Sequence, residues 1–284
     1  MGIILAIVVA FLTSVQDIVS KRLLRRLDVI VVTWGWWTFS LVPLGMLAMR
    51  ERPLIPTENF WPVLGAAAFL VVISVIYYIK ALSVSDLSLA VPILNLTPLF
   101  LLITSPLMLH ESPHPLGAAG VVLIVAGMYL LFYQKEGWHV FAPFRNLLKG
   151  SGTRSMLIVA AIFSISGNLD KMGVVLSSPF LWVFWLNLAV SVVLTGILIR
   201  DRKSIKMSFV LPLLVLGSVN AFCLLLQMNI IQSMQVPYLI AIKRTSVIFT
   251  ALYGFTFLKE KQKGKRLLAI LLAIAGVFLV ALSS

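Results

Sequence analysis

Long runs of apolar residues alternate with short polar segments along the whole chain. A helix needs about 20 apolar residues to cross the hydrocarbon layer of a bilayer, so each run predicts one membrane-spanning α-helix. Strands of a membrane β-barrel instead alternate apolar and polar residues over about ten positions. The sequence therefore predicts an all-α membrane protein with ten transmembrane helices. The runs cover residues 2–20, 29–49, 60–82, 86–109, 116–133, 155–176, 180–199, 208–231, 236–258 and 267–283.

The composition places this chain outside the class of ordinary soluble domains. Of its 284 residues, 60% are apolar and 12% are charged, and the mean hydropathy is +1.04. A soluble domain has about 45–50% apolar and about 25% charged residues. The first segment, Met1 to Val19, lacks the basic start and the small-residue cleavage site of a signal peptide. We therefore expect this segment to be retained as the first helix.

The basic residues lie mostly at the ends of the apolar runs and predict how the chain is oriented. With ten crossings, the segments between the runs fall into two sets on opposite sides of the membrane. The segments after the first, fifth, seventh and ninth runs hold 17 Lys and Arg, whereas the opposite set holds Arg50 and Arg52. Basic loops stay in the cytoplasm. The count predicts a multi-pass protein of the cell (inner) membrane with both termini outside. Because the basic residues are explained by this orientation, we expect no nucleic-acid partner despite the net charge of +13.

The two halves of the sequence repeat each other. Leu109 to Glu111 corresponds to Leu258 to Glu260 at a spacing of 149 residues, and Gly127 and Gly276 have the same spacing. Each half then contains five of the ten apolar runs. The repeat therefore predicts two five-helix units joined end to end.

We expect the first repeat to span residues 1–134, a basic connecting segment to span 135–154, and the second repeat to span 155–284. An odd number of crossings in each repeat inverts the second repeat relative to the first. Inverted repeats are a common architecture of secondary transporters, whose substrate site lies near the membrane midplane between the repeats. The organisation of the chain thus favours a carrier.

The repeated motif resembles the drug/metabolite transporter superfamily, and in particular its EamA-like ten-helix carriers. The resemblance rests on the apolar run that ends in Leu109 to Glu111 and on the Gly-containing helix that follows it, a pattern that the second half repeats. Tyr77 to Leu82, and Lys21 and Lys171 at the ends of the first helix of each half, also match. The resemblance covers nearly the whole chain and implies a ten-helix fold and a transport function. It selects no substrate, because this superfamily carries amino acids, cations, sugars, nucleotide sugars and organophosphates.

A basic pair, Lys243 and Arg244, lies deep inside the run 236–258. An intramembrane charge costs at least about 2.5 kcal/mol, so the pair is expected to face a cavity or a counter-charge. Ammonium and guanidinium groups suit carboxylate or phosphate oxygens. The pair is similar to the phosphate-binding pair of the triose-phosphate translocators, although Leu94 and Asn95 stand where those carriers place another lysine. The alternative is a structural ion pair with one of the intramembrane acids Asp17, Asp86 and Asp170.

Further polar residues inside the runs are candidates for the same substrate site. Asp170 and Lys171 follow a polar stretch that a helix facing lipid would not need, or they mark a helix end in contact with water. Lys171 is expected to close an anion site with Lys243, and Asp170 to carry a proton or to neutralise the pair in the empty carrier. Lys80 either binds the substrate or extends its side chain to the cytoplasmic interface. A single amide side chain inside a run is also explained by a hydrogen bond between helices. The substrate-binding candidates are Lys243, Arg244, Lys171, Asp170, Asn168, Asn95, Tyr78, Lys80, Asn220, Gln227, Tyr238 and Trp34.

No motif for a metal, a cofactor or an enzyme is found in the sequence. His110 and His114 have the spacing of helical ligands, but Pro113 and Pro115 break the helix that would align them. Cys223 is the only cysteine, which excludes a disulfide framework and a cysteine-based metal site. A Gly-rich phosphate-binding loop, as in ATP-driven pumps, is missing from the sequence. We expect no metal, no cofactor and no enzymatic activity.

The sequence thus predicts a secondary transporter that moves a small anionic organic solute across the plasma membrane by alternating access. An organophosphate, a phosphonate or a carboxylate would suit the basic pair. The expected partners are this solute, membrane lipids, and a counter-substrate or a proton. Two alternatives stay open: an exporter of amino acids or other small metabolites in which the basic pair is structural, and a flippase for a lipid phosphate.

Overall fold

The computed structural model describes residues 2–48, 56–84, 93–132, 151–203, 205–246, 248–249 and 263–283. Over this part of the chain the secondary structure is helical and no strand is present, which confirms the all-α prediction. One described α-helix falls in each of the ten predicted runs. The helices are α1 (Gly2–Leu23), α2 (Val29–Ala48), α3 (Phe60–Val84), α5 (Thr97–Leu109), α6 (Pro115–Phe132), α8 (Ser151–Leu176), α9 (Pro179–Arg200), the 3-10 helix η1 (Met207–Phe209), α10 (Val210–Ile231), α11 (Val236–Arg244) and α13 (Lys263–Ser283).

Several helices are long and apolar enough to cross a membrane. Within the described ranges, five qualify by length and composition, namely α1, α2, α8, α9 and α10 with η1. Shorter apolar helical stretches lie in α3, α5, α6 and α13. Large apolar side chains are exposed on almost all of these helices, such as Phe69 at 65%, Leu107 at 73% and Val175 at 71%. Such an apolar surface is unusual in a soluble monomer and suits contact with lipid, so the chain is a multi-pass membrane protein.

The chain divides into two compact units. Unit 1 comprises Met1–Val72 and Leu169–Ser233, and unit 2 comprises Ile73–Asn168 and Met234–Ser284. Each unit therefore combines helices from both halves of the sequence, and α3 and α8 contribute residues to both units. The spatial division differs from the boundaries of the sequence repeats, which stay a prediction.

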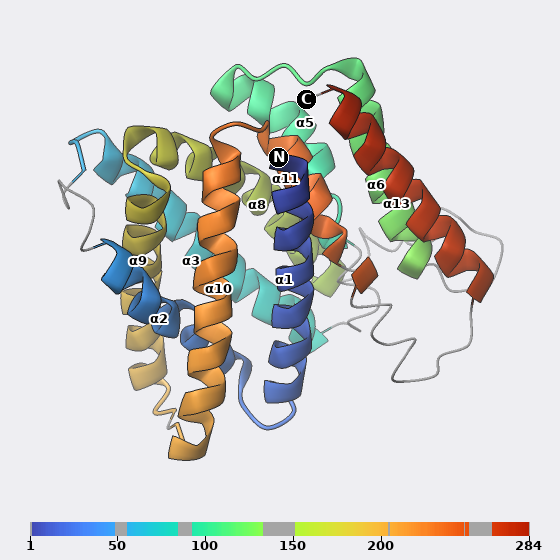
Figure 1. Ribbon diagram of the computed structural model, residues 1–284. Helices are drawn as coiled ribbons and strands as arrows, with labels where there is room; N and C mark the ends of the chain where they lie inside the picture. Colours follow the sequence, from blue (N-terminus) through green and yellow to red (C-terminus); the bar gives the residue numbers. More distant parts are fainter. Residues whose placement is uncertain are drawn as a thin grey trace. The chain divides into compact units, whose positions relative to one another are not determined.

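In unit 1, α2 packs against α9 and α10, and α1 packs against α10 (Figure 1). The apolar contact near one end joins Leu23 of α1, Val31 and Val32 of α2, and Leu213 of α10. The close approach of α10 to α2 requires a small residue at position 217, because a Cβ atom added to Gly217 of α10 would lie 2.6 Å from the Phe39 Cβ of α2. Interfaces between membrane helices use small residues in this way.

In unit 2, α6 and α13 lie side by side, and α11 packs against α5 and α6 (Figure 1). Gly120 and Gly276 face each other at the α6–α13 interface. A Cβ atom on Gly120 would lie 2.6 Å from the Gly276 carbonyl oxygen, so the two backbones are nearly in contact. The start of α11 is held by the segment between α5 and α6, because the Val236 backbone N–H donates to the Glu111 carboxylate at 3.3 Å. A carboxylate is stabilising there, since the helix N-terminus carries partial positive charge.

An ion pair brings two of the basic loops to the same end of unit 1. The Lys203 Nζ, after α9, lies 2.6 Å from the Asp28 Oδ2, between α1 and α2. This hydrogen bond is the main reason that the pKa of Asp28 is below its ordinary value, and a backbone hydrogen bond from Ile30 adds to the effect. The loops after the first and seventh predicted helices therefore lie on one side, as the positive-inside prediction requires.

Candidate functional site

Helix α5 begins at an interruption inside a predicted span. The run 86–109 predicts one continuous helix, but residues 95–96 form a turn and α5 starts at Thr97. Pro98 has no N–H, so it cannot make the bond to the Leu94 carbonyl that a continuous helix would have. The Thr97 hydroxyl donates to this carbonyl instead, at 2.7 Å. The Thr-Pro dipeptide thus explains the interruption.

Helix α11 also ends inside a predicted span. The run 236–258 predicts one helix, yet α11 stops at Arg244 and helical geometry resumes only after Thr245. The Thr245 hydroxyl donates to the Ile242 carbonyl at 2.6 Å and so satisfies an acceptor at the helix end. The basic pair consequently occupies the last turn of α11, where the negative end of the helix dipole stabilises cations.

These two interruptions meet in unit 2. The Arg244 Nη2 atom donates to the Thr97 hydroxyl oxygen at 3.3 Å. Asn95 and Arg244 are 149 residues apart, which is the spacing of the sequence repeat, so they occupy equivalent positions in the two halves. Interrupted helices at equivalent positions of two repeats are the best structural pointer to a transporter's substrate site. We therefore take this junction as the candidate site.

A buried amide lies at the same interruption. Asn95 is only 3% exposed, and its Nδ2 atom has no hydrogen-bond acceptor in the described part of the chain. Leaving a buried amide donor unsatisfied costs about 1–3 kcal/mol, so this atom requires an explanation. An oxygen atom of a bound solute would satisfy it.

Aromatic and aliphatic side chains pack beside the interruption. Leu94 forms a buried cluster with Met156 and Val159 of α8, and Tyr77 and Tyr78 of α3 pack against this cluster. The structure thus places Tyr78, a predicted candidate, in the same packed cluster as the residue before Asn95. An apolar wall with a few convergent polar groups is typical of small-molecule sites.

Thr97 was missed as a candidate by the sequence analysis. Threonine is common in apolar membrane helices, so the residue by itself carries little information. The available signal was the Thr97-Pro98 dipeptide in an apolar run, because a proline inside a helix leaves a carbonyl that a neighbouring hydroxyl often bonds. What the sequence does not reveal is that the same hydroxyl also accepts from Arg244.

Two other candidates of unit 2 have well-defined partners. The Asn168 amide in α8 accepts from the Ser105 hydroxyl at 2.7 Å and donates to the Thr104 hydroxyl at 3.0 Å. These bonds join α8 to α5, which is the alternative role considered for single amides. The Tyr238 hydroxyl donates to the His114 carbonyl at 3.4 Å. Contact of either residue with substrate stays a prediction.

The candidates of unit 1 take part in a separate set of contacts. The Asn220 amide lies 2.9 Å from the Gln16 amide and donates to the Ser40 hydroxyl at 3.0 Å, which links α10 to α1 and α2. The Trp34 indole donates to the Thr195 hydroxyl at 2.9 Å and so joins α2 to α9. Gln227 is buried at 3% exposure in α10.

The acidic and basic candidates of α8 lie in unit 1 as well. Asp170 accepts a hydrogen bond from the Trp182 indole at 2.9 Å, and Lys171 is half-buried. Their expected pairing with the basic pair of α11 stays a prediction. Asp86 and the side chain of Lys80 lie outside the described residues. In the described part of the chain, no three His, Cys, Asp or Glu residues are grouped to hold a metal ion.

Comparisons with known proteins agree with this architecture. The model of the EamA-like transporter family matches residues 1–133 and 151–282. A solved structure described only as "Crystal structure of protein" is 16% identical, covers 99% of this chain and 95% of its own, and has a TM-score of 0.76. At this identity the likeness supports the fold alone. The search of curated proteins gave no match.

Proposed function

Because the chain belongs to the EamA-like transporter family, we propose that it is a secondary carrier of a small anionic organic solute, working by alternating access. The family is one of membrane transporters of small solutes, so the proposal concerns the solute and the mode of transport. An organophosphate, a phosphonate or a carboxylate is the proposed substrate class. The cell (inner) membrane with both termini outside is the proposed location, from the positive-inside count.

The hydrogen bond between Arg244 and Thr97 carries this proposal. It joins the two interrupted helices of unit 2 at the level of the repeat-equivalent residues Asn95 and Arg244. The bond positions the Arg244 guanidinium, a group that suits carboxylate and phosphate oxygens, at the interruption before α5.

The donors at the junction match the oxygens of an anion. A guanidinium presents a planar fork of N–H groups to a carboxylate or phosphate, and the unsatisfied Nδ2 of Asn95 offers one more donor. Lys243, the neighbouring cation, adds a compact charge. The triose-phosphate translocators bind phosphate with a similar pair, but Leu94 and Asn95 stand where those carriers place another lysine. A carboxylate therefore stays as suitable as a phosphate.

The charge of the site suggests how transport is coupled. Closing a cavity around two cations is costly, because taking a charge out of water is unfavourable. A bound anion lowers this cost, so closure would follow binding and the carrier would exchange one anion for another. If Asp170 instead neutralises Arg244 in the empty carrier, uniport or proton coupling becomes feasible.

A thermal-unfolding screen of the purified protein tests the substrate class. The panel contains organophosphates, phosphonates, dicarboxylates, zwitterionic amino acids and organic cations at equal concentration. A ligand at 100 times its Kd stabilises the folded state by about 2.7 kcal/mol, so a substrate gives a clear rise in Tm. We expect anions to raise Tm in the wild-type protein and in neither Lys243→Gln nor Arg244→Gln.

Arg200→Gln is the matched control for the loss of one positive charge. Arg200 is 78% exposed at the end of α9 and pairs with Asp201, so this variant should keep the full ligand response. Stabilisation by amino acids or cations that survives in the Arg244→Gln variant would show that the pair is structural and favour the metabolite exporter. A response confined to lipids with a phosphate headgroup would favour the flippase.

A further inference from the structure

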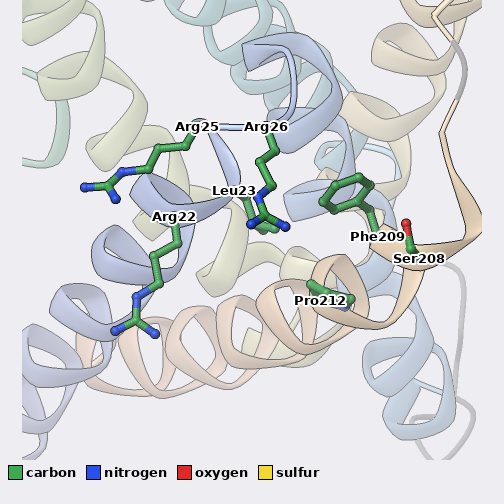
Figure 2. Close-up of a pocket in the computed structure, with 7 residues that line it drawn as sticks. All are labelled: Arg22, Leu23, Arg25, Arg26, Ser208, Phe209 and Pro212. Atoms are coloured by element: carbon green, nitrogen blue, oxygen red, sulfur yellow. The ribbon is translucent and has the colours of Figure 1, made fainter.

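A cavity of about 520 Å³ is lined only by residues of unit 1. Three arginines at the end of α1 and in the following turn line one side, and the start of α10 with η1 lines the other (Figure 2). Its volume lies within the range of about 300–1,000 Å³ typical of small-molecule sites. The lining residues are Arg22, Leu23, Arg25, Arg26, Ser208, Phe209 and Pro212.

The cavity is strongly cationic. Arg22, Arg25 and Arg26 are all exposed. Asp28, the acidic residue of the same turn, is 2.6 Å from Lys203 and is therefore engaged by a different cation. An anion is the ligand that this charge distribution favours.

The opposite wall of the cavity is largely apolar. Phe209 and Pro212, which line this wall, are half-buried, and Leu23 on the α1 side is 7% exposed. Next to them, Met207 and Leu211 present exposed side chains, at 85% and 68%. Guanidinium groups beside exposed apolar residues at a helix end are typical of the membrane interface, where headgroups meet acyl chains.

We propose that this cavity binds the headgroup of an anionic phospholipid. The phosphodiester oxygens accept hydrogen bonds from the guanidinium groups and from the Ser208 hydroxyl. The glycerol and the first acyl carbons lie along Phe209 and Pro212, and the chains continue past Met207 and Leu211 into the bilayer. A free phosphate would bind the arginines but would gain nothing from the apolar wall or from the exposed apolar side chains next to it.

Native mass spectrometry of the detergent-purified protein tests this assignment. The protein is mixed with equal amounts of phosphatidylglycerol and phosphatidylcholine, and the retained lipids are counted. A basic side chain near a membrane surface strengthens anionic lipid binding by about fivefold, so we expect phosphatidylglycerol to be retained at least about fivefold better. Equal retention of the two lipids by the wild-type protein would overturn the proposal.

A pair of matched triple variants locates the binding. Arg22→Gln/Arg25→Gln/Arg26→Gln should lose the preference for phosphatidylglycerol. The control Arg200→Gln/Arg202→Gln/Lys206→Gln removes the same charge from the neighbouring loop, outside the cavity lining, and should keep the preference. Loss in both variants alike, or in neither, would overturn the assignment. If the first variant does not accumulate, Arg26→Gln alone should give a smaller loss in the same direction, and an unchanged preference would count against the site.

A competition arm separates the lipid from a soluble phosphate. Glycerol 3-phosphate and inorganic phosphate at millimolar concentration are added to the protein loaded with phosphatidylglycerol. We expect the lipid to stay bound, because the apolar wall holds its glycerol and acyl carbons. Displacement of the lipid by either soluble phosphate at this concentration would show that the cavity is a phosphate site and not a lipid site.

Discussion

A single hydroxyl, that of Thr97, connects the backbone of an interrupted helix with an intramembrane cation. It donates to the Leu94 carbonyl at 2.7 Å and accepts from Arg244 at 3.3 Å. One hydroxyl has one proton and two lone pairs, so both roles are satisfied together. At the residue scale, the position of the Arg244 guanidinium thus depends on how the Thr97-Pro98 interruption is built.

Gly120 provides a second test at the residue scale. An alanine Cβ there would lie 2.6 Å from the Gly276 carbonyl oxygen and 3.0 Å from Val280, so α6 and α13 must separate. We expect Gly120→Ala to destabilise the protein by about 1–3 kcal/mol, as overpacking does. Thermal unfolding in detergent measures the change in Tm.

Gly196→Ala is the control for this substitution. Gly196 lies inside α9, and its added Cβ would have no atom within 4 Å. Alanine is favoured over glycine in a helix by up to about 1 kcal/mol, so Tm should be unchanged or higher. A Gly120→Ala variant that behaves like Gly196→Ala would contradict the close approach of α6 and α13.

At the element scale, the interruption before α5 can be removed by one substitution. In Pro98→Ala the restored N–H can bond the Leu94 carbonyl, which releases the Thr97 hydroxyl and favours a continuous helix. We expect Tm in the absence of ligand to stay the same or rise, because alanine can make the backbone hydrogen bond that Pro98 cannot make. The rise in Tm caused by the most stabilising anion of the screen should become smaller.

Pro106→Ala is the matched control, since Pro106 lies in the interior of the same helix and away from the junction with Arg244. It should leave the ligand response at its wild-type size. Were Pro98→Ala to respond to the anion as strongly as the wild-type protein, the interruption would have no part in binding.

At the scale of the whole molecule, the orientation in the membrane can be measured through one cysteine. The native Cys223 is buried at 1% exposure, so the wild-type protein gives a low background. Glu58, before α3, is exposed and lies on the predicted outer side, whereas Lys206, before η1, is exposed and lies on the predicted cytoplasmic side. In intact cells, an impermeant maleimide should label Glu58→Cys and spare Lys206→Cys.

Disruption of the cells should then make Lys206→Cys reactive, which controls for its expression. The opposite labelling pattern would reverse the orientation without affecting the fold. Labelling of both positions in intact cells would contradict the odd number of crossings between them that the ten-helix topology requires.

The two compact units show an organisation that the repeat alone does not reveal. Sequence similarity at a spacing of 149 residues divides the chain near its middle, yet each compact unit takes helices from both halves. These helices are apolar on nearly all sides, so they have no polar stripe that would indicate which face meets a neighbour. In a membrane, helix contacts depend on small residues and local shape, and these signals are weak in one sequence.

The sequence by itself determined the fold class, the place of a helix in each of the ten runs and the presence of a basic pair inside one of them. Bilayer thickness fixes the length of an apolar helix, and the cost of an intramembrane charge makes Lys243 and Arg244 conspicuous. Both properties depend on residues that are close together in the sequence, so they can be read without a structure. The match of the EamA-like transporter family to residues 1–133 and 151–282 agrees with the predicted ten-helix fold.

Only the tertiary structure decided which residues share a site. Arg244 and Thr97 are 147 residues apart, and the Asn168 amide is engaged by two hydroxyls of α5. The arginines at the end of α1 and in the following turn line a cavity only because η1 and the start of α10 lie opposite them. Each of these contacts depends on how helices cross and on where their backbones are interrupted, and neither property is set by hydrophobicity along the chain.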